Sequence, residues 1–217
     1  MAKNYYAEDM EAAKKAKANA NRNTYEWIQS LVSALVVCVV FFLFGVRVID
    51  VKGSSMLPTL VNKDKMIVSK LFFKPKAGDV VVLKKDEYDP NKALVKRIIA
   101  TEGQAINIDF DNGKVYIAVK PEKEDEKQVF YEIEEDYINE PTMRKLDFIG
   151  PKTVPEGCVF VMGDNRNAST DSRKTEIGMV DTRLLLGKVH AVLFPTSHLG
   201  VVRTDGMRMT DRTLEQG

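Results

Sequence analysis

Residues 93–119 read ALVKRIIATEGQAINIDFDNGKVYIAV, and their pattern decides the fold. Three runs rich in valine and isoleucine are separated by polar residues, and each run has the length of a strand rather than a helix. The turn-forming residues Asp111, Asn112 and Gly113 separate the last two runs, which predicts a tight hairpin. This stretch therefore predicts neighbouring antiparallel strands.

The same pattern extends outward, and no long segment with a helical period occurs after residue 47. We expect strands at Val46–Val51, Lys65–Leu71, Asp79–Leu83, Ala93–Ala100, Ala105–Asp109, Val115–Val119, Val129–Ile133, Cys158–Met162 and Gly187–Phe194. The predicted fold class is mainly β, with one antiparallel β-rich domain over residues 47–203. We expect the acidic segment Pro121–Asp136 to be an exposed insertion without a site, and residues 204–217 to form a frayed polar tail.

An uncharged run, Trp27–Val46, precedes this domain and is about as long as a bilayer core requires. A buried core helix is the alternative, but Glu26 and Arg47 flank the run closely. No A-x-A pattern follows, so we expect an uncleaved signal anchor at 27–46 rather than a removed signal peptide. Basic residues within residues 1–26 predict a cytoplasmic N-terminus and an extracytoplasmic domain in a single-pass cell-membrane protein.

The composition excludes several classes of function. Lys and Arg total 32 against 31 Asp and Glu, and this balance does not favour nucleic-acid binding. The chain has two cysteines, Cys38 and Cys158, and two histidines, His190 and His198. These supply neither a disulfide framework nor a metal cluster, and we expect no cofactor and no metal.

Three stretches carry groups suited to chemistry: Gly53–Leu60, Ala93–Ala100 and Val161–Arg173. On a strand, Lys96 shares one face with apolar neighbours, and desolvation there would lower the pKa of its amine toward that of a base. Each stretch alone is also compatible with an ordinary loop, or with a lysine that reaches water along its apolar stem.

Taken in this order, the three stretches resemble the sequence boxes of type I signal peptidases. The segment Ser55-Met56-Leu57-Pro58-Thr59-Leu60 matches the nucleophile box of that family, and Lys96-Arg97 matches its lysine box. The third box, G-D-N-R-x-x-S-x-D-S-R, is long and distinctive and matches residues 163–173. The segments Gly78–Val82, Gly187–Val189 and Phe194-Pro195 also resemble family segments.

The resemblance implies a serine endopeptidase that cleaves N-terminal signal peptides from exported preproteins after a small residue at position −1. Ser55 would be the nucleophile, and neutral Lys96 the general base of a Ser-Lys dyad that needs no histidine. Ser169 would orient the lysine amine, and the backbone N–H of Ser55 would form part of the oxyanion hole. Gly53 stands where some members carry a serine that donates to the oxyanion.

The family comparison assigns supporting roles to further residues. The expected structural network consists of Asp164, Arg166, Asp171 and Arg173. The expected substrate-binding residues, which would line pockets for side chains −1 and −3 of an extended peptide, are Val51, Met56, Leu94 and Val95. Expected partners are signal peptides, membrane lipid and nearby export machinery. Asn167, Lys174-Thr175-Glu176 and Val180-Asp181 depart from the usual family pattern.

Three alternatives differ in what they require. A penicillin-binding protein needs S-x-x-K, S-D-N and K-T-G, and the sequence contains none of these. A self-cleaving repressor peptidase would be soluble and linked to DNA binding. A non-catalytic, membrane-anchored β-rich adaptor would keep the fold without needing Ser55 and Lys96.

Overall fold

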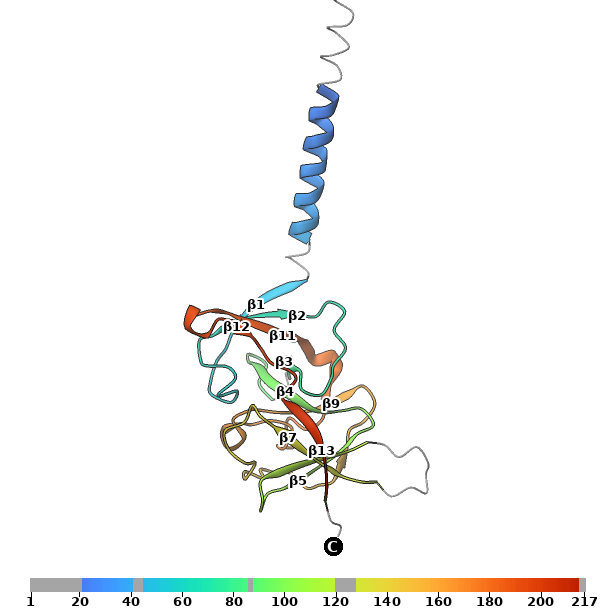
Figure 1. Ribbon diagram of the computed structural model, residues 1–217, viewed down its shortest axis with the longest axis vertical. Coiled ribbons are helices and arrows are strands. Elements are labelled where there is room, and N and C mark those ends of the chain that lie inside the picture. Colours follow the sequence, from blue (N-terminus) through green and yellow to red (C-terminus); the bar gives the residue numbers. More distant parts are fainter. Residues whose placement is uncertain (1–20, 41–44, 86–87, 120–127, 215–217) are drawn as a thin grey trace, which may run out of the picture. The chain divides into compact units, whose positions relative to one another are not determined.

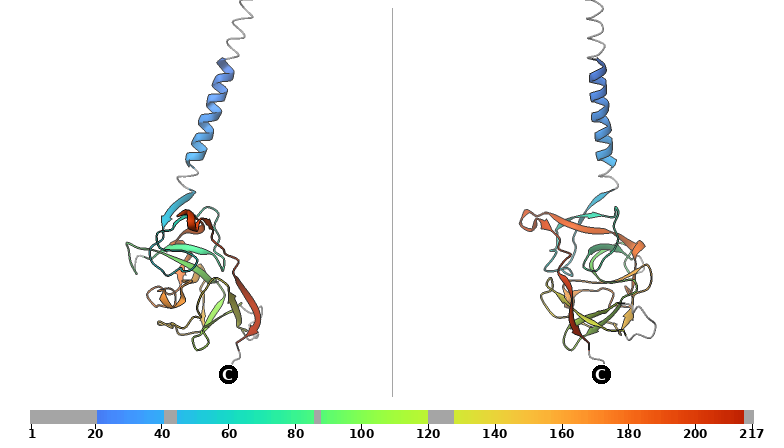
Figure 2. Two further views of the ribbon diagram at one scale, coloured as in Figure 1. Left: turned by 60° about the vertical axis from the view of Figure 1, so that its left-hand side comes forward. Right: turned by 45° about the vertical axis from the view of Figure 1, so that its right-hand side comes forward.

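The computed structural model describes residues 21–40, 45–85, 88–119 and 128–214. The chain divides into an N-terminal unit and a β-rich unit that starts at Val46 (Figures 1 and 2). In the first unit, Asn21–Val40 forms a helix that is long and apolar enough to cross a membrane. Part of the uncharged run, residues 41–44, lies outside the described residues, and Val46 at its end already begins the first strand.

Every run expected to form a strand overlaps one, although β7 begins and ends two residues later than expected. The strands are β1 Val46–Asp50, β2 Lys65–Ser69, β3 Val80–Lys84, β4 Ala93–Thr101, β5 Ala105–Asp109, β6 Lys114–Ala118, β7 Tyr131–Glu135, β8 Lys152–Thr153, β9 Cys158–Met162, β10 Val180–Asp181, β11 Leu185–Phe194, β12 Gly200–Val201 and β13 Met207–Thr213. Short 3-10 turns are η1 Arg166–Ala168, η2 Thr182–Leu184 and η3 Thr196–His198. The predicted hairpin is confirmed, because β5 and β6 pair antiparallel from Asp109 opposite Lys114.

The strands form two antiparallel sheets. The first has the order β1-β2-β11-β3-β4-β9-β10, with β12 paired to β11, and the second has the order β13-β7-β6-β5-β8. The mainly β, antiparallel fold class is therefore correct. Strand β4 and its neighbour β9 contribute buried residues to the core shared with the second sheet, so they join the two sheets.

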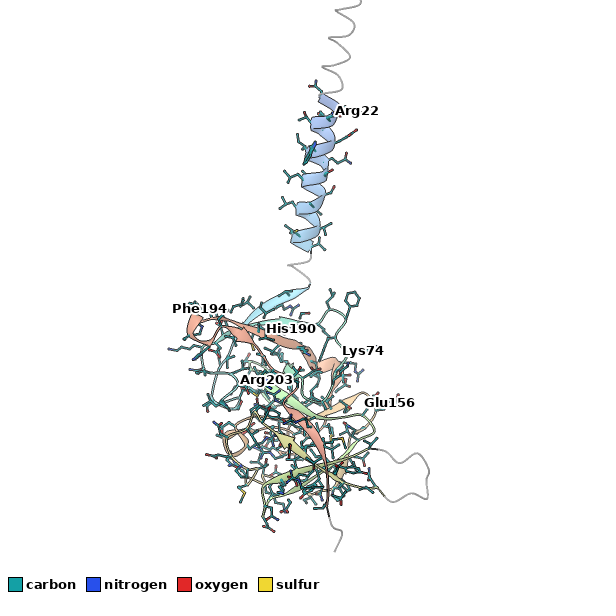
Figure 3. All side chains as sticks on the ribbon, viewed as in Figure 1. Arg22, Lys74, Glu156, His190, Phe194 and Arg203 are labelled. Carbon is teal, nitrogen blue, oxygen red and sulfur yellow. The ribbon has the colours of Figure 1, made fainter. Side chains whose placement is uncertain are left out.

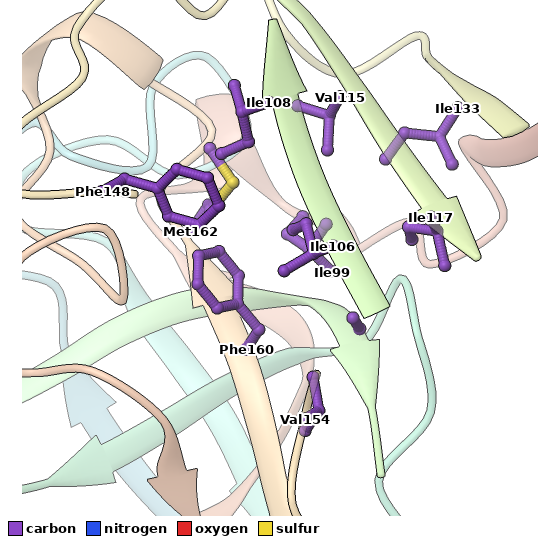
Figure 4. Packing of buried hydrophobic residues seen from close by; sticks show 11 residues of the cluster. Ile99, Ile106, Ile108, Val115, Ile117, Ile133, Phe148, Val154, Phe160 and Met162 are labelled. Atoms are coloured by element: carbon purple, nitrogen blue, oxygen red, sulfur yellow. The ribbon is translucent and has the colours of Figure 1, made fainter. Parts of the chain in front are cut away.

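The core between the two sheets is built from the short valine- and isoleucine-rich runs, which bury their side chains there and so hold the sheets together. Phe148 and Phe160 meet edge to face with ring centroids 5.8 Å apart, and Ile99, Ile106 and Met162 pack around them (Figure 4). Each such buried side chain contributes about 1.5–3 kcal/mol relative to an exposed one. A second cluster joins Met66 and Val80 of the first sheet to Val51, Met56 and Leu60 of the segment that follows β1.

The expected frayed tail is wrong in its central part. Met207–Thr213 forms β13, which pairs with β7 from Met207 opposite Glu135. Because β13 is an edge strand with mostly exposed side chains, its composition is polar and carries little strand signal.

Strands β1 and β4 each have a stretch of edge that pairs with no other described strand. Strand β4 pairs with β3 along Ala93–Arg97, but β9 pairs with it only from Arg97 onward. Within the described strands, the other edge of Ala93–Lys96 has no partner. Strand β1 pairs only with β2, so it too keeps one free edge.

Candidate active site

The structure brings Ser55 and Lys96 into direct contact. Ser55 lies in a turn after β1, in which the Leu57 N–H donates to the Ser54 carbonyl at 3.2 Å. Lys96 is held on β4, and its Nζ donates to Ser55 Oγ at 2.7 Å. A hydroxyl and an amine at this distance can exchange a proton directly.

The surroundings of Lys96 favour the neutral amine. The side chain is 2% exposed, and burial lowers the pKa of Lys96 from 10.5 to about 8. The Asp171 carboxylate opposes this shift of the pKa, whereas the Lys92 ammonium adds to it. A pKa near 8 leaves about a tenth of the amine neutral at pH 7, several hundred times more than an ordinary lysine would have.

The loop after β9 holds the turn around Ser55 in place by hydrogen bonds to its backbone carbonyls. The Asn165 backbone N–H donates to the Ser55 carbonyl at 3.1 Å, and its Nδ2 donates to the Ser54 carbonyl at 3.1 Å. Gly163 makes this approach possible, because a Cβ there would collide with the Ser55 carbonyl and with Ser169 Oγ. The Ser55 N–H itself donates to no group in the described part of the chain.

Ser169 is fully buried beside Gly163. Its Oγ has no hydrogen-bond partner in the described structure, so a bond from Ser169 to the Lys96 amine is not present. The expected orienting role of Ser169 therefore stays a prediction.

Asp164 ties the lysine strand to this loop. Its carboxylate accepts from Arg97 Nε at 2.9 Å and from Arg97 Nη2 at 2.7 Å, and Thr59 Oγ1 donates to it at 2.5 Å. Both charged side chains are almost fully buried. Such a bidentate pair fixes the orientation of the two side chains relative to each other. Loss of either partner leaves the other as an unpaired buried charge.

A second buried pair shapes the other end of the loop. Arg173 Nε donates to Asp171 Oδ1 at 2.8 Å, and the Gly163 N–H donates to Asp171 Oδ2 at 3.0 Å. Burial alone would raise the pKa of Asp171, but these donors hold it below its ordinary value. Arg173 Nη2 also donates to the Arg166 carbonyl at 2.7 Å, which connects the expected network residues.

One residue of the buried network, Glu135, comes from the segment 121–136, expected to contain no site, and its partner Tyr137 follows that segment. Glu135, at the end of β7, accepts from Arg166 Nη1 at 2.6 Å, and Tyr137 donates to Glu135 at 2.5 Å. The Arg97 guanidinium lies 3.8 Å from the Tyr137 ring centroid. The expectation of an exposed insertion is therefore wrong at Glu135. The acidic composition concealed it, since one glutamate of a charged run cannot be distinguished from its neighbours by pattern.

The four residues expected to bind substrate line one cavity of about 190 Å³. Val51, Met56, Leu94 and Val95 line it together with Gly53, Ser55 and Lys96. An adjoining groove of about 620 Å³ runs between Val48–Asp50 of β1 and the start of β4. Lys52 and Lys92 line both spaces.

Two positions that depart from the family pattern, Gly53 and Asn167, have clear local contacts. Gly53 has φ +97°, and its N–H donates to Asn62 Oδ1 at 3.1 Å, so this donor is already engaged. The Asn167 amide donates to Glu140 Oε2 at 3.0 Å and accepts from the Met143 N–H at 3.1 Å. An aspartate at position 167 could not donate and would repel Glu140. No cluster of His, Cys, Asp or Glu in the described ranges is arranged to hold a metal ion.

Comparisons with known proteins identify the family of the chain. Residues 24–194 match the model of the family "Signal peptidase, peptidase S26". The chain is 34% identical over 184 residues to a probable signal peptidase I-1 of Synechocystis sp., covering 81% of this chain and 85% of that protein. It is 32% identical over 192 residues to signal peptidase I of Bacillus licheniformis, covering 83% and 94%. It is 33% identical over 184 residues to signal peptidase IB of Staphylococcus aureus, covering 79% and 90%.

Among solved structures, a signal peptidase I of Enterococcus faecalis V583 shares 22% identity with a TM-score of 0.33, covering 56% of this chain and 98% of that one. The family match spans most of the sequence and includes all three boxes. The chain therefore belongs to the signal peptidase family, peptidase S26, and is a membrane-anchored peptidase that cleaves signal peptides.

Proposed function

We propose that the chain is a serine endopeptidase that cleaves N-terminal signal peptides from exported preproteins with Ser55 as nucleophile and Lys96 as general base. The observation that carries the proposal is the 2.7 Å contact between Lys96 Nζ and Ser55 Oγ, made by an amine that is 2% exposed. Burial supplies the neutral amine that a lysine base requires.

The reaction follows from the positions of these groups. Ser55 Oγ attacks the carbonyl carbon at the cleavage site while its proton passes to Lys96 Nζ. The Ser55 N–H, which has no acceptor in the described structure, donates to the developing oxyanion. Lys96 then protonates the leaving amine, and a water activated by the same lysine hydrolyses the acyl-enzyme. Ser169 Oγ accepts from the lysine amine during these transfers.

The substrate binds as an extended strand between the open edges of β1 and β4. Its backbone pairs with these edges, which would otherwise lack partners in the described sheet. Side chains −1 and −3 enter the cavity lined by Val51, Met56, Leu94 and Val95. Small residues at positions −1 and −3 are expected there from the resemblance to the family.

Membrane anchoring sets the place of the reaction. The anchor is the uncharged run that precedes β1, residues 1–26 lie in the cytoplasm, and the β-rich unit that starts at Val46 lies outside the cell membrane near the export machinery and lipid. The substrate is held in the same bilayer, so a shared membrane raises its effective concentration at the cavity. The orientation rests on the basic residues that precede the anchor.

The test compares cleavage of a model preprotein with A-x-A before its cut site, in detergent micelles, by three purified proteins. Ser54→Ala is the matched control for Ser55→Ala, because its side chain makes no hydrogen bond in the described structure and lies in the same turn. We expect cleavage after the −1 alanine by wild type and Ser54→Ala only. Equal cleavage by Ser55→Ala would assign another nucleophile, and no cleavage by any of them would favour the non-catalytic adaptor.

A further inference from the structure

Two exposed lysines lie where the cavity beside the dyad adjoins the larger groove. Lys52 follows Val51 on the segment that leaves β1, and Lys92 directly precedes β4, so they come from the two sides of the groove. Both residues line the cavity as well as the groove. Neither ammonium group makes an ion pair within the described part of the chain. Two positive charges without a partner of opposite sign therefore border the path proposed for the peptide.

The acidic residues near these lysines are already engaged. Asp50 lines the groove and lies 3.7 Å from the Lys65 ammonium group. Asp89 also lines the groove, and its Oδ1 accepts from the Asn91 N–H at 3.0 Å. The described residues that line the cavity include three lysines and no acidic residue, and the buried carboxylates behind it are paired with arginines. The cavity is therefore a place that attracts a negative charge and repels a positive one.

The spacing along the chain indicates which part of a substrate would meet these lysines. This step rests on the proposed function, in which the bond to be cut lies at the dyad. Residues assigned to side chains −1 and −3, such as Val51 and Leu94, precede the dyad in both segments, so earlier peptide residues continue toward Lys92. An extended chain advances about 3.3 Å per residue, which places Lys92 about 13 Å before Lys96. Peptide residues −4 and −5 would then lie level with Lys92 and Lys52.

We propose that Lys52 and Lys92 select substrates by charge at positions −4 and −5, where an acidic side chain is preferred to a neutral one and a basic side chain is disfavoured most. A carboxylate there gains two ion pairs, whereas an ammonium or guanidinium group meets two like charges. One exposed ion pair changes a binding constant by up to about fivefold, so two lysines should give about a tenfold range between glutamate and lysine. The selection adds a rule of charge to the expected small residues at −1 and −3.

The first experiment measures binding without cleavage. The full-length Ser55→Ala protein, in micelles of an uncharged detergent, is titrated with peptides that carry an uncharged dye and alanine at −1 and −3. The peptides differ only at −4 and −5, which are both glutamate, both glutamine or both lysine. We expect the Kd from fluorescence anisotropy to rise in that order by about tenfold in total. The range should shrink in concentrated salt, because exposed charges are screened.

Variants of the two lysines test whether they cause this range. With Lys52→Gln and Lys92→Gln combined, the three peptides should bind with similar Kd values. With Lys52→Glu and Lys92→Glu combined, the order should be reversed. The control is Lys74→Gln, because Lys74, which Figure 3 labels, is exposed on the loop between β2 and β3 and lines neither space. The wild-type range in the double glutamine variant, or its loss in Lys74→Gln, would overturn the proposal.

Cleavage by proteins that keep Ser55 separates this proposal from the proposed function. We expect kcat/KM of the wild type for matching preproteins to fall in the order glutamate, glutamine, lysine, and the ratio between them to disappear in the double glutamine variant. The ratio compares substrates on one enzyme, so a changed pKa of Lys96 in the variant does not affect it. Equal cleavage of all three by the wild type would overturn the charge selection and leave the peptidase assignment intact. Charge-dependent binding without any cleavage would support the charge selection and overturn the proposed function.

Discussion

The two sides of the candidate site are built in opposite ways. The side behind Ser55 and Lys96 is a cradle of buried ion pairs: Arg97 with Asp164, Arg173 with Asp171, and Arg166 with Glu135. The substrate side consists of two unpaired strand edges, with exposed lysines beside a shallow cavity. The charged groups of the cradle are paired with one another, whereas backbone groups along the groove have no partner in the described strands. Under the proposed mechanism, the geometry for the chemical step is fixed in advance, whereas the binding surface is completed by the peptide.

The sharpest test of the cradle removes the amine that it holds. We expect Lys96→Met to lower kcat at least about a thousandfold, because the serine loses its base. The protein should stay folded, since a buried apolar side chain replaces a buried amine. Retention of most activity, measured by single-turnover cleavage, would show that Lys96 is not the base.

A second variant tests the cradle through stability. Asp164→Asn keeps the shape of the side chain but leaves the buried Arg97 without its charge partner, and we expect a loss of about 3–5 kcal/mol in the free energy of unfolding. Urea unfolding of the full-length protein in micelles measures it. The control is Asp181→Asn, which breaks the exposed pair with Arg183 and should change the midpoint little. Similar midpoints for the two variants would contradict a preorganised cradle.

A substitution in the groove should act on binding instead. Val95→Phe narrows the cavity between Leu94 and the serine turn, and we expect KM to rise about tenfold with kcat nearly unchanged. Val129→Phe, at a half-exposed position just before β7 of the other sheet, is the control. A fall in kcat without a change in KM would mean that Val95 belongs to the cradle rather than to the groove.

The smallest expected effect on activity comes from Lys92, which lines the groove and acts on Lys96 of the cradle. Activity should rise with pH through about 8, because Lys96 must lose its proton to act as the base. Lys92 lowers the pKa of Lys96, so Lys92→Ala should raise that pKa and move the rise to higher pH. We expect about a twofold loss at pH 7 and none at high pH. A shift to lower pH, or the same shift for the exposed control Lys145→Ala, would contradict the assignment.

Sequence reasoning recovered the antiparallel fold and the residues that meet at the cavity. Strands such as β4 and β9 are strongly apolar because both sheets bury them, and the boxes around Ser55 and Lys96 contain chemically distinctive residues. It missed β13, whose exposed edge leaves a polar pattern, and Glu135, whose partner Arg166 is distant in sequence. A single chain carries no local signal for such a pairing, since either residue could equally face water.

The open edges of β1 and β4 have a consequence for the empty enzyme. An unpaired strand edge is a template for association with the edge of another copy, which leads to aggregates. Here the unpaired edges are short, and Lys52 and Lys92 line the two spaces between them. Two copies that tried to pair through this edge would bring four ammonium groups together at close range. The same lysines that border the proposed substrate path would thus keep neighbouring copies in a crowded membrane from joining edge to edge.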